Sequence, residues 1–253
     1  MRLQRLNMDN SWHLEFGNTR VLVDPWLKGA EVDFFSWFNK QSHSTASVSI
    51  SDVPTYDVVL ITQKYPDHFH IETLLELNPK RLVVPKSIYQ KVKRALPGSE
   101  VYTFDQWSES VSDSSLNLHH IPSYRSIDPI YDALLLEDGS QSVLLATHGY
   151  DPRWRELING YPPVALALTP FNHYRLPKVL GGDVSPGMTA VEALIQDLSP
   201  THIVATHDED KQASGLIPML ANITWAPSGQ ELLKSELFKD RLLTISNYHP
   251  LTL

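Results

Sequence analysis

The feature that most constrains this chain is a short apolar run, Val58-Val59-Leu60-Ile61, that stops at the polar stretch Thr62–His70. An apolar run of this length is typical of a buried strand whose two faces are both covered. The polar side chains that follow it, Asp67 and His68 among them, then lie where the strand ends. The sequence therefore predicts a site built from the residues that this strand delivers.

The composition limits what such a site can contain. The chain has 253 residues, 42% of them hydrophobic, which is enough for a full core. It has no cysteine, so disulfides, thiolate zinc sites and cysteine nucleophiles are excluded, and any metal must be held by imidazole and carboxylate groups. The net charge of −8 argues against a broad surface for nucleic acid and favours a small-molecule partner. There is neither a long apolar run nor a signal segment, so we expect no membrane partner and a cytoplasmic location.

The remaining elements are predicted from hydrophobic periodicity and turn residues. Besides the run at 58–61, strands are expected at Leu3–Met8, Trp12–Phe16, Arg20–Val23, Arg81–Pro85, Val101–Phe104, Leu116–Ile121, Tyr131–Leu136, Ser142–Ala146, Val164–Leu168 and His202–Thr206. Helices are expected at Ile71–Leu77, Lys86–Leu96, after Pro152, at Gly187–Leu198 and over Ala213–Leu220. A meander of strands that passes into strands alternating with helices predicts a two-sheet layered α/β fold, in a single domain over residues 1–253.

Residues 28–55 are predicted to be a long connection without regular structure. Phe34, Phe35, Trp37 and Phe38 cluster in it. A loop of this length is usually a cover over a site or a mobile segment. The aromatic cluster is therefore explained by a lid over a pocket, by a contact between subunits of a homo-oligomer, or equally well by ordinary core packing.

Three of the predicted strands are followed by a histidine. Asp67-His68 follows the run at 58–61, His148 follows Val143–Ala146, and His207 follows Ile203–Ala205. Strand ends at one edge of a sheet converge, and three histidines with one carboxylate suit zinc, iron or manganese. Any one of these histidines is better explained by a capping or core role, but their recurrence favours a metal site.

The order of these motifs resembles the metallo-β-lactamase-fold superfamily, and most closely its branch of metal-dependent hydrolases related to ascorbate-6-phosphate lactonase. The motifs that carry the resemblance are Ser11–Leu14, Val21–Leu27, Thr62–His68, Ile121–Tyr124, Leu144–Tyr150 and Ser199–His207. The resemblance implies a four-layer αβ/βα sandwich of two mixed sheets flanked by helices, with the site at one edge of the sheets. It also implies a hydrolase that uses a divalent metal.

The resemblance places the metal ligands unevenly. In the family, the first metal is held by three histidines, and their positions are occupied here by Gln63, Tyr65 and Arg125. The ligands of the second metal match Asp67, His68 and His207, and the aspartate that bridges both metals aligns with His148. The resemblance therefore implies one metal, zinc or alternatively iron or manganese, at Asp67, His68, His148 and His207.

Other residues have expected roles around that metal. Arg125 and Tyr65 are expected to stabilise developing negative charge, together with Asp67 as a catalytic group. Asp24 is expected at a strand tip, where its carboxylate either orients site groups or only forms a turn before Pro25. Candidates for contacts with the substrate are His70, His173 and Arg175, and an anionic substrate is one of the alternatives. Capping or solvated roles explain these three residues almost as well.

Two further alternatives remain open. His119 or His120 could replace a missing histidine of the first metal site, although a core or surface role is more common at such positions. The chain could also be a metal-free, non-catalytic member of the fold that binds a ligand or a protein, and in that case Arg125 would pair with Asp67. A nuclease is disfavoured by the acidic composition.

Overall fold

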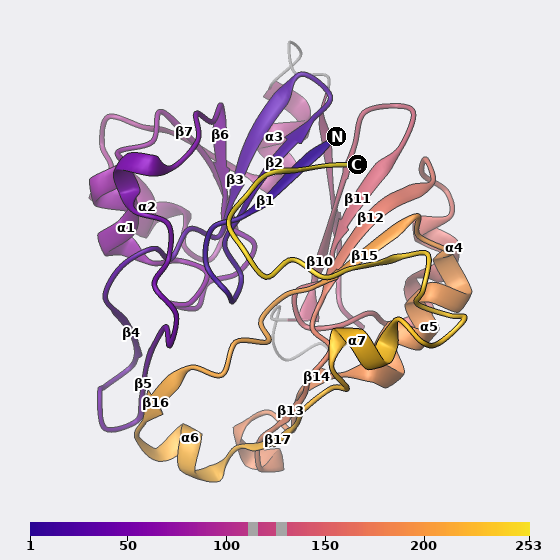
Figure 1. Ribbon diagram of the computed structural model, residues 1–253. Coiled ribbons are helices and arrows are strands. Elements are labelled where there is room, and N and C mark those ends of the chain that lie inside the picture. Colours follow the sequence, from indigo (N-terminus) through magenta and orange to yellow (C-terminus); the bar gives the residue numbers. More distant parts are fainter. Residues whose placement is uncertain (111–115, 125–130) are drawn as a thin grey trace. The chain divides into compact units, whose positions relative to one another are not determined.

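The computed structural model describes residues 1–110, 116–124 and 131–253 (Figure 1). The chain divides into two compact units. Unit 1 contains Met1–His119, Glu209–Leu216 and Ser246–Leu253, and unit 2 contains His120–Asp208 and Ile217–Ile245. Each unit has its own sheets and helices, and the prediction of a single domain stays a prediction.

Unit 1 is built on a mixed sheet of seven strands. Their order is β19 (Leu251–Thr252), β1 (Arg2–Arg5), β2 (Trp12–Phe16), β3 (Thr19–Val23), β6 (Val58–Leu60), β7 (Arg81–Val84) and β8 (Glu100–Thr103). Strands β1 to β3 pair antiparallel, whereas β3, β6, β7 and β8 pair parallel. Parallel neighbours require crossovers, and α1 (Ile71–Leu77) and α2 (Tyr89–Ala95) supply them between β6, β7 and β8. A third helix, α3 (Phe104–Ser110), follows β8.

The helices of unit 1 cover an apolar face of this sheet. Leu74 of α1 and Val92 of α2 are fully buried with Leu22, Val59 and Leu82 from three successive strands. Figure 1 shows α1 and α2 beside β6 and β7. Because β6 is buried along its whole length, the residues that follow it are held at a fixed position. The strand predicted from the apolar run is confirmed.

The connection at residues 28–55 contains more structure than the sequence predicted. It forms the hairpin β4 (Ala30–Asp33) and β5 (Asn39–Ser42), to which β16 (Gln212–Ser214) adds a third strand, and a short 3₁₀ turn at Ile50–Asp52. Phe34, Phe35 and Trp37 in the loop of this hairpin are 75%, 60% and 66% exposed. The aromatic cluster is therefore not ordinary core, because these three rings project from the hairpin instead of packing beneath it.

Unit 2 is built on a mixed sheet of six strands. Their order is β18 (Leu242–Leu243), β15 (His202–Ala205), β12 (Val164–Thr169), β11 (Ser142–Leu145), β10 (Ala133–Glu137) and β9 (Asn117–Ile121). A smaller sheet contains β14 (Asp183–Pro186), β13 (His173–Arg175) and β17 (Asn222–Thr224). The remaining helices are α4 (Arg155–Ile158), α5 (Met188–Leu198), α6 (Leu216–Leu220) and α7 (Gly229–Leu232).

Helix α5 is the main cover of the six-stranded sheet. Its buried residues Val191 and Leu194 pack in one cluster with Leu144, Ala167 and Ile203 from three neighbouring strands. The amphipathic helix predicted at Gly187–Leu198 is therefore confirmed with its first residue as the cap. The sheet in turn fixes the ends of β11 and β15, which His148 and His207 follow.

Several predicted elements differ from the observed ones; the helix predicted at Lys86–Leu96, for example, is observed at Tyr89–Ala95. The strand Leu3–Met8 ends at Arg5, because the side chain of Asn7 accepts three backbone N–H groups and turns the chain. The helix after Pro152 begins as a 3₁₀ turn and becomes α4 at Arg155. The helix Ala213–Leu220 begins only at Leu216, because Gly215 has a φ of +109° and ends β16. No helix in the described part of the chain is both long and apolar enough to span a membrane.

Candidate metal centre

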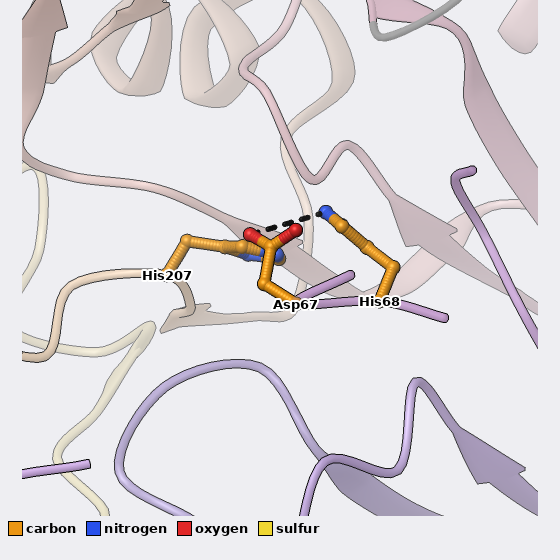
Figure 2. Close-up of side chains that lie close together, drawn as sticks. All are labelled: Asp67, His68 and His207. Carbon is orange, nitrogen blue, oxygen red and sulfur yellow. Dashed lines mark ion pairs between the residues drawn. The ribbon is translucent and has the colours of Figure 1, made fainter. Parts of the chain in front are cut away.

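In unit 1 the loop after β6 holds Asp67 and His68 side by side. The backbone N–H groups of His68 and Phe69 both donate to the carbonyl of Tyr65, which forms a tight turn. Asn10 donates from Nδ2 to the carbonyl of Asp67 at 2.6 Å. The Asp67 Oδ2 and His68 Nε2 atoms are 3.9 Å apart, as the dashed line in Figure 2 marks. The loop therefore presents one carboxylate and one imidazole nitrogen to the same point.

The other nitrogen of His68 is bound to Asp24. His68 Nδ1 lies 2.8 Å from Asp24 Oδ2, and both side chains are fully buried. A carboxylate only accepts, so Nδ1 carries the hydrogen and Nε2 carries the lone pair of the neutral ring. An imidazole held in this way by a carboxylate is the usual arrangement for a histidine that ligates a metal. The predicted orienting role of Asp24 is therefore observed.

Asp24 is itself fixed by the strand ends around it. Its carboxylate accepts from the backbone N–H of Thr62 at 2.7 Å and from the Thr62 hydroxyl at 2.5 Å. Its backbone has a φ of +44°, and the Ser11 hydroxyl donates to its carbonyl at 2.7 Å. A left-handed backbone at a residue other than glycine costs free energy and is often found at functional sites. The contacts with Thr62 and Ser11 hold Asp24 in this conformation.

The charge of His68 responds to these carboxylates. Burial lowers its pKa, but Asp67 and Asp24 raise it, and the net shift is upward. Without a metal, the ring therefore tends to hold a proton on Nε2. A divalent cation would take the place of that proton, since metal binding to histidine is linked to proton release. The donor set of Asp67 and His68 fits such an ion.

A group of buried charges in unit 1 surrounds Asp67. Lys211 Nζ lies 2.8 Å from Asp9 Oδ2, and the Asp9 side chain is fully buried. Burial lowers the pKa of Lys211, but Asp9 and Asp67 raise it further, so the amine stays charged. Glu31 is only 3% exposed, and burial together with the negative charge of Asp67 raises its pKa to about 8. Glu31 is therefore mostly neutral at pH 7, and Lys211 is the positive charge of the group.

The segment that carries Lys211 is anchored separately. Glu209 accepts from His43 Nδ1 at 2.5 Å and from the backbone N–H groups of Ser44 and Thr45. His43 Nε2 lies 3.0 Å from the carbonyl of Trp26. These contacts fix residues 209–211 on unit 1.

In unit 2 the predicted ligands His148 and His207 lie next to each other. Their ring centroids are 5.7 Å apart, and the rings are inclined by 41°. His207 lies two residues after the end of β15 and has a φ of +60°. Like Asp24, it therefore has a left-handed backbone, which is often found at functional sites. Unit 2 therefore supplies two imidazoles from the chain that follows β11 and β15, the strands on either side of β12.

The positions predicted for a first metal contain no histidine. Gln63 is buried, and the ring of Tyr65 lies under Lys64 Nζ at 5.0 Å. Arg125 lies outside the described residues, so its predicted pairing with Asp67 and its catalytic role stay predictions. His120 pairs with Asp132 at 2.7 Å, which gives it a partner in unit 2. The placement of His119 at a metal also stays a prediction.

The predicted substrate contacts have structural partners. His70 caps α1, because its Nδ1 accepts from the backbone N–H of Thr73 at 3.3 Å. His173 and Arg175 both face Asp183 across β13 and β14, at 3.0 and 3.6 Å. Their contact with a substrate stays a prediction.

Known proteins resemble this arrangement. Residues 7–128 match the family model described as beta-lactamase superfamily domain. The isothiocyanate hydrolase from Delia radicum gut bacteria aligns over 100% of this chain and 99% of its own, with 15% identity and a TM-score of 0.68. The chain has the metallo-β-lactamase fold. The predicted fold class and superfamily are thereby confirmed.

Two further structures with this fold align over nearly the whole chain. A possible metal-dependent hydrolase from Veillonella parvula covers 100% of this chain and 99% of its own, with 14% identity and a TM-score of 0.73. The metallo-β-lactamase fold protein YhfI from Bacillus subtilis covers 99% and 98%, with 11% identity and a TM-score of 0.60. No curated protein matches the sequence. The branch related to ascorbate-6-phosphate lactonase stays a prediction.

Three features of the centre were not predicted from the sequence. The stretch Asn7–Ser11 is rich in residues that bond to their own backbone, which is a signal for the turn that positions Asn10. Glu31 and Lys211 have no comparable signal, because their burial depends on segments far apart in the chain. The charge balance around Asp67 therefore emerges only in the folded unit.

Proposed function

We propose that this protein is a metal-dependent hydrolase of a small-molecule substrate that binds one divalent metal. The ligands that we propose are Asp67, His68, His148 and His207, three of which are drawn in Figure 2. The observation that carries the proposal is the bond from His68 Nδ1 to the buried Asp24 carboxylate, which directs the other ring nitrogen toward Asp67. The chemistry of the set, imidazole and carboxylate, suits zinc first and iron or manganese next.

The proposed chemistry is hydrolysis of a carbonyl or phosphoryl compound. When bound, a divalent metal lowers the pKa of water and polarises the oxygen that is attacked. The side chain of Asp67 is 23% exposed, and it can accept a proton from the attacking water or return it to the leaving group. Tyr65 and Arg125 are proposed to donate hydrogen bonds to the charge that develops on the substrate oxygen. Lys211 supplies a fixed positive charge that interacts with Asp67.

The first experiment is elemental analysis of the protein purified without chelator. We expect about one equivalent of zinc, iron or manganese, since four protein ligands suffice for one ion. His68→Ala and His207→Ala should each lose most of this metal. His249→Ala, which removes an exposed histidine near the C-terminus, is the matched control and should keep it.

The opposite result has a definite meaning. Protein that contains no metal and takes up none when titrated with zinc, iron or manganese would refute the proposal. It would favour the second candidate, a non-catalytic member of the fold that binds a ligand or a protein partner. The replacement of the first-metal positions by Gln63 and Tyr65 is the observation behind that candidate. The cytoplasmic location and a homo-oligomer remain expectations from the sequence.

A further inference from the structure

Unit 2 contains a cavity of about 220 Å³ next to His148. Its wall is formed by residues that follow β9, precede β10 and follow β11 as far as the 3₁₀ turn before α4, together with the end of β14. They include Ser123, Tyr131, His148, Tyr150, Asp151 and Trp154. The cavity therefore combines three large aromatic side chains with one of the proposed metal ligands.

The aromatic side chains present carbon to this cavity, because their polar atoms are bonded to the protein. The three bonds join Tyr131 Oη to the carbonyl of Asp183 at 2.6 Å, Tyr150 Oη to Asp197 Oδ2 at 3.2 Å, and Trp154 Nε1 to the carbonyl of Pro122 at 3.0 Å. Burial and the Asp197 carboxylate both raise the pKa of Tyr150, so its hydroxyl remains a donor to that carboxylate. The three rings therefore form the apolar part of the wall, beside the polar side chains of Ser123, His148 and Asp151.

The polar end of the cavity lies at His148. The ring of Tyr131 meets that of His148 edge to face, with the centroids 6.4 Å apart. Asp151, also in the wall, has its charge balanced by Arg153, whose Nε and Nη2 donate to it at 2.9 and 2.5 Å. No lysine or arginine belongs to the wall as the described residues form it. Among the described residues, a ligand in the cavity therefore meets the three aromatic rings, the imidazole of His148 and the carboxylate of Asp151 that Arg153 pairs with.

The wall is rigid where it passes Gly149. This residue has a φ of +100°, and a Cβ added to it would lie 2.6 Å from Pro186 Cδ. Pro186 thus packs directly against the Gly149 backbone, between His148 and Tyr150. Such close packing keeps the cavity preformed, which is typical of small-molecule sites.

We propose that this cavity binds an uncharged aromatic group of the substrate, and that the bond to be hydrolysed lies at the His148 end. An apolar cavity of about 150 Å³ is known to hold one benzene ring. The larger volume here leaves room for a ring with a short linker of a few atoms. The proposal rests on the proposed function for the position of the reacting group, but the cavity can be tested separately.

The test measures binding of 4-fluorobenzyl alcohol to the zinc-treated protein by fluorine NMR, with 4-fluorobenzoate as the charged comparison. The alcohol should bind in the millimolar range and at least tenfold more tightly than the benzoate. Ser123→Leu places a larger side chain in the wall and should weaken alcohol binding at least tenfold, whereas Ser123→Ala should leave it within twofold. Should Ser123→Leu not fold, Tyr131→Ala and Tyr131→Phe replace the pair, since only the first removes the ring.

Each outcome decides one of the two proposals. Absence of alcohol binding, equal binding to Ser123→Leu and to the unchanged protein, or benzoate binding as tight as that of the alcohol overturns the cavity assignment. The zinc content is measured on the same samples. Zinc without alcohol binding supports the metal site and refutes the cavity assignment. Alcohol binding without zinc supports the cavity assignment and refutes the metal site.

Discussion

Replacement of Glu31 by Gln tests the charge balance around Asp67. Glu31 is buried in unit 1, and its pKa is raised from 4.5 to about 8, first by burial and then by the negative charge of Asp67. A carboxyl whose pKa is higher in the folded protein than in the unfolded chain favours folding when it is protonated. The free energy of unfolding therefore falls progressively as the pH rises from the pKa of this carboxyl in the unfolded chain, about 4.5, to its pKa in the folded protein, about 8.

The magnitude follows from the size of the shift. Each unit of pKa difference corresponds to about 1.4 kcal/mol, so the shift of Glu31 lowers the free energy of unfolding by about 3 kcal/mol between pH 5 and pH 8. Gln has nearly the same shape and no ionisation. The Glu31→Gln variant should therefore gain stability over the unchanged protein as the pH rises, and the gain should level off above pH 8.

The measurement is urea unfolding of both proteins at pH 5, 6, 7, 8 and 9 with a chelator present, so that no metal on Asp67 alters the local charge. Glu15→Gln, at a more exposed carboxyl that pairs with Arg2, is a matched control and should show no comparable gain. A difference between Glu31→Gln and the unchanged protein that stays constant or shrinks with rising pH would refute the reasoning. It would mean that Glu31 is ionised in the folded unit and balanced by Lys211.

Two further predictions concern the frame of each unit. Asp57 accepts hydrogen bonds from the Arg20 side chain at 2.6 and 3.0 Å, and these bonds lower the pKa of Asp57. Because both side chains are more than a third exposed, the Asp57→Asn substitution should lower the free energy of unfolding by only about 0.5–1 kcal/mol at pH 7. Urea titrations should show this difference disappearing as the pH falls below about 4. In unit 2, Gly149→Ala places a Cβ against Pro186 at a positive φ and should lower the free energy of unfolding by about 2–4 kcal/mol in thermal or urea unfolding. Gly139 also has a positive φ but has open space around it, so Gly139→Ala should cost about 1 kcal/mol. A similar loss for both variants would contradict the packing argument.

Local signals in the sequence predicted much of the frame. Ile71–Leu77 is a helix with the predicted bounds, and the run at 58–61 is a buried strand that ends at the predicted site. Asp24 was predicted to orient site groups because a proline follows it at a strand end, and it binds His68. In each case the residues that decide the outcome are neighbours in the chain or members of one periodic pattern.

Long-range burial explains what the sequence did not predict. Lys211 and Asp9 are separated by about two hundred residues, and neither lies in an apolar pattern that would indicate burial. The hairpin β4–β5 contains Glu31 and Lys40 and lacks the alternation of a half-buried strand, so it resembled a loop. Its pairing with β16 also joins segments that lie far apart in the sequence. Such contacts depend on the tertiary fold and not on local propensity.

The discontinuous make-up of unit 1 bears on how the protein is synthesised. The ribosome releases Asp9 and Asp67 early, but the ammonium group of Lys211 that balances them emerges only after most of unit 2. Strand β1 likewise keeps an open edge until Leu251–Thr252 arrive to pair with it. Nascent chains therefore carry an incomplete first unit throughout the synthesis of the second, and chaperones that recognise unpaired strand edges have a long interval in which to bind them.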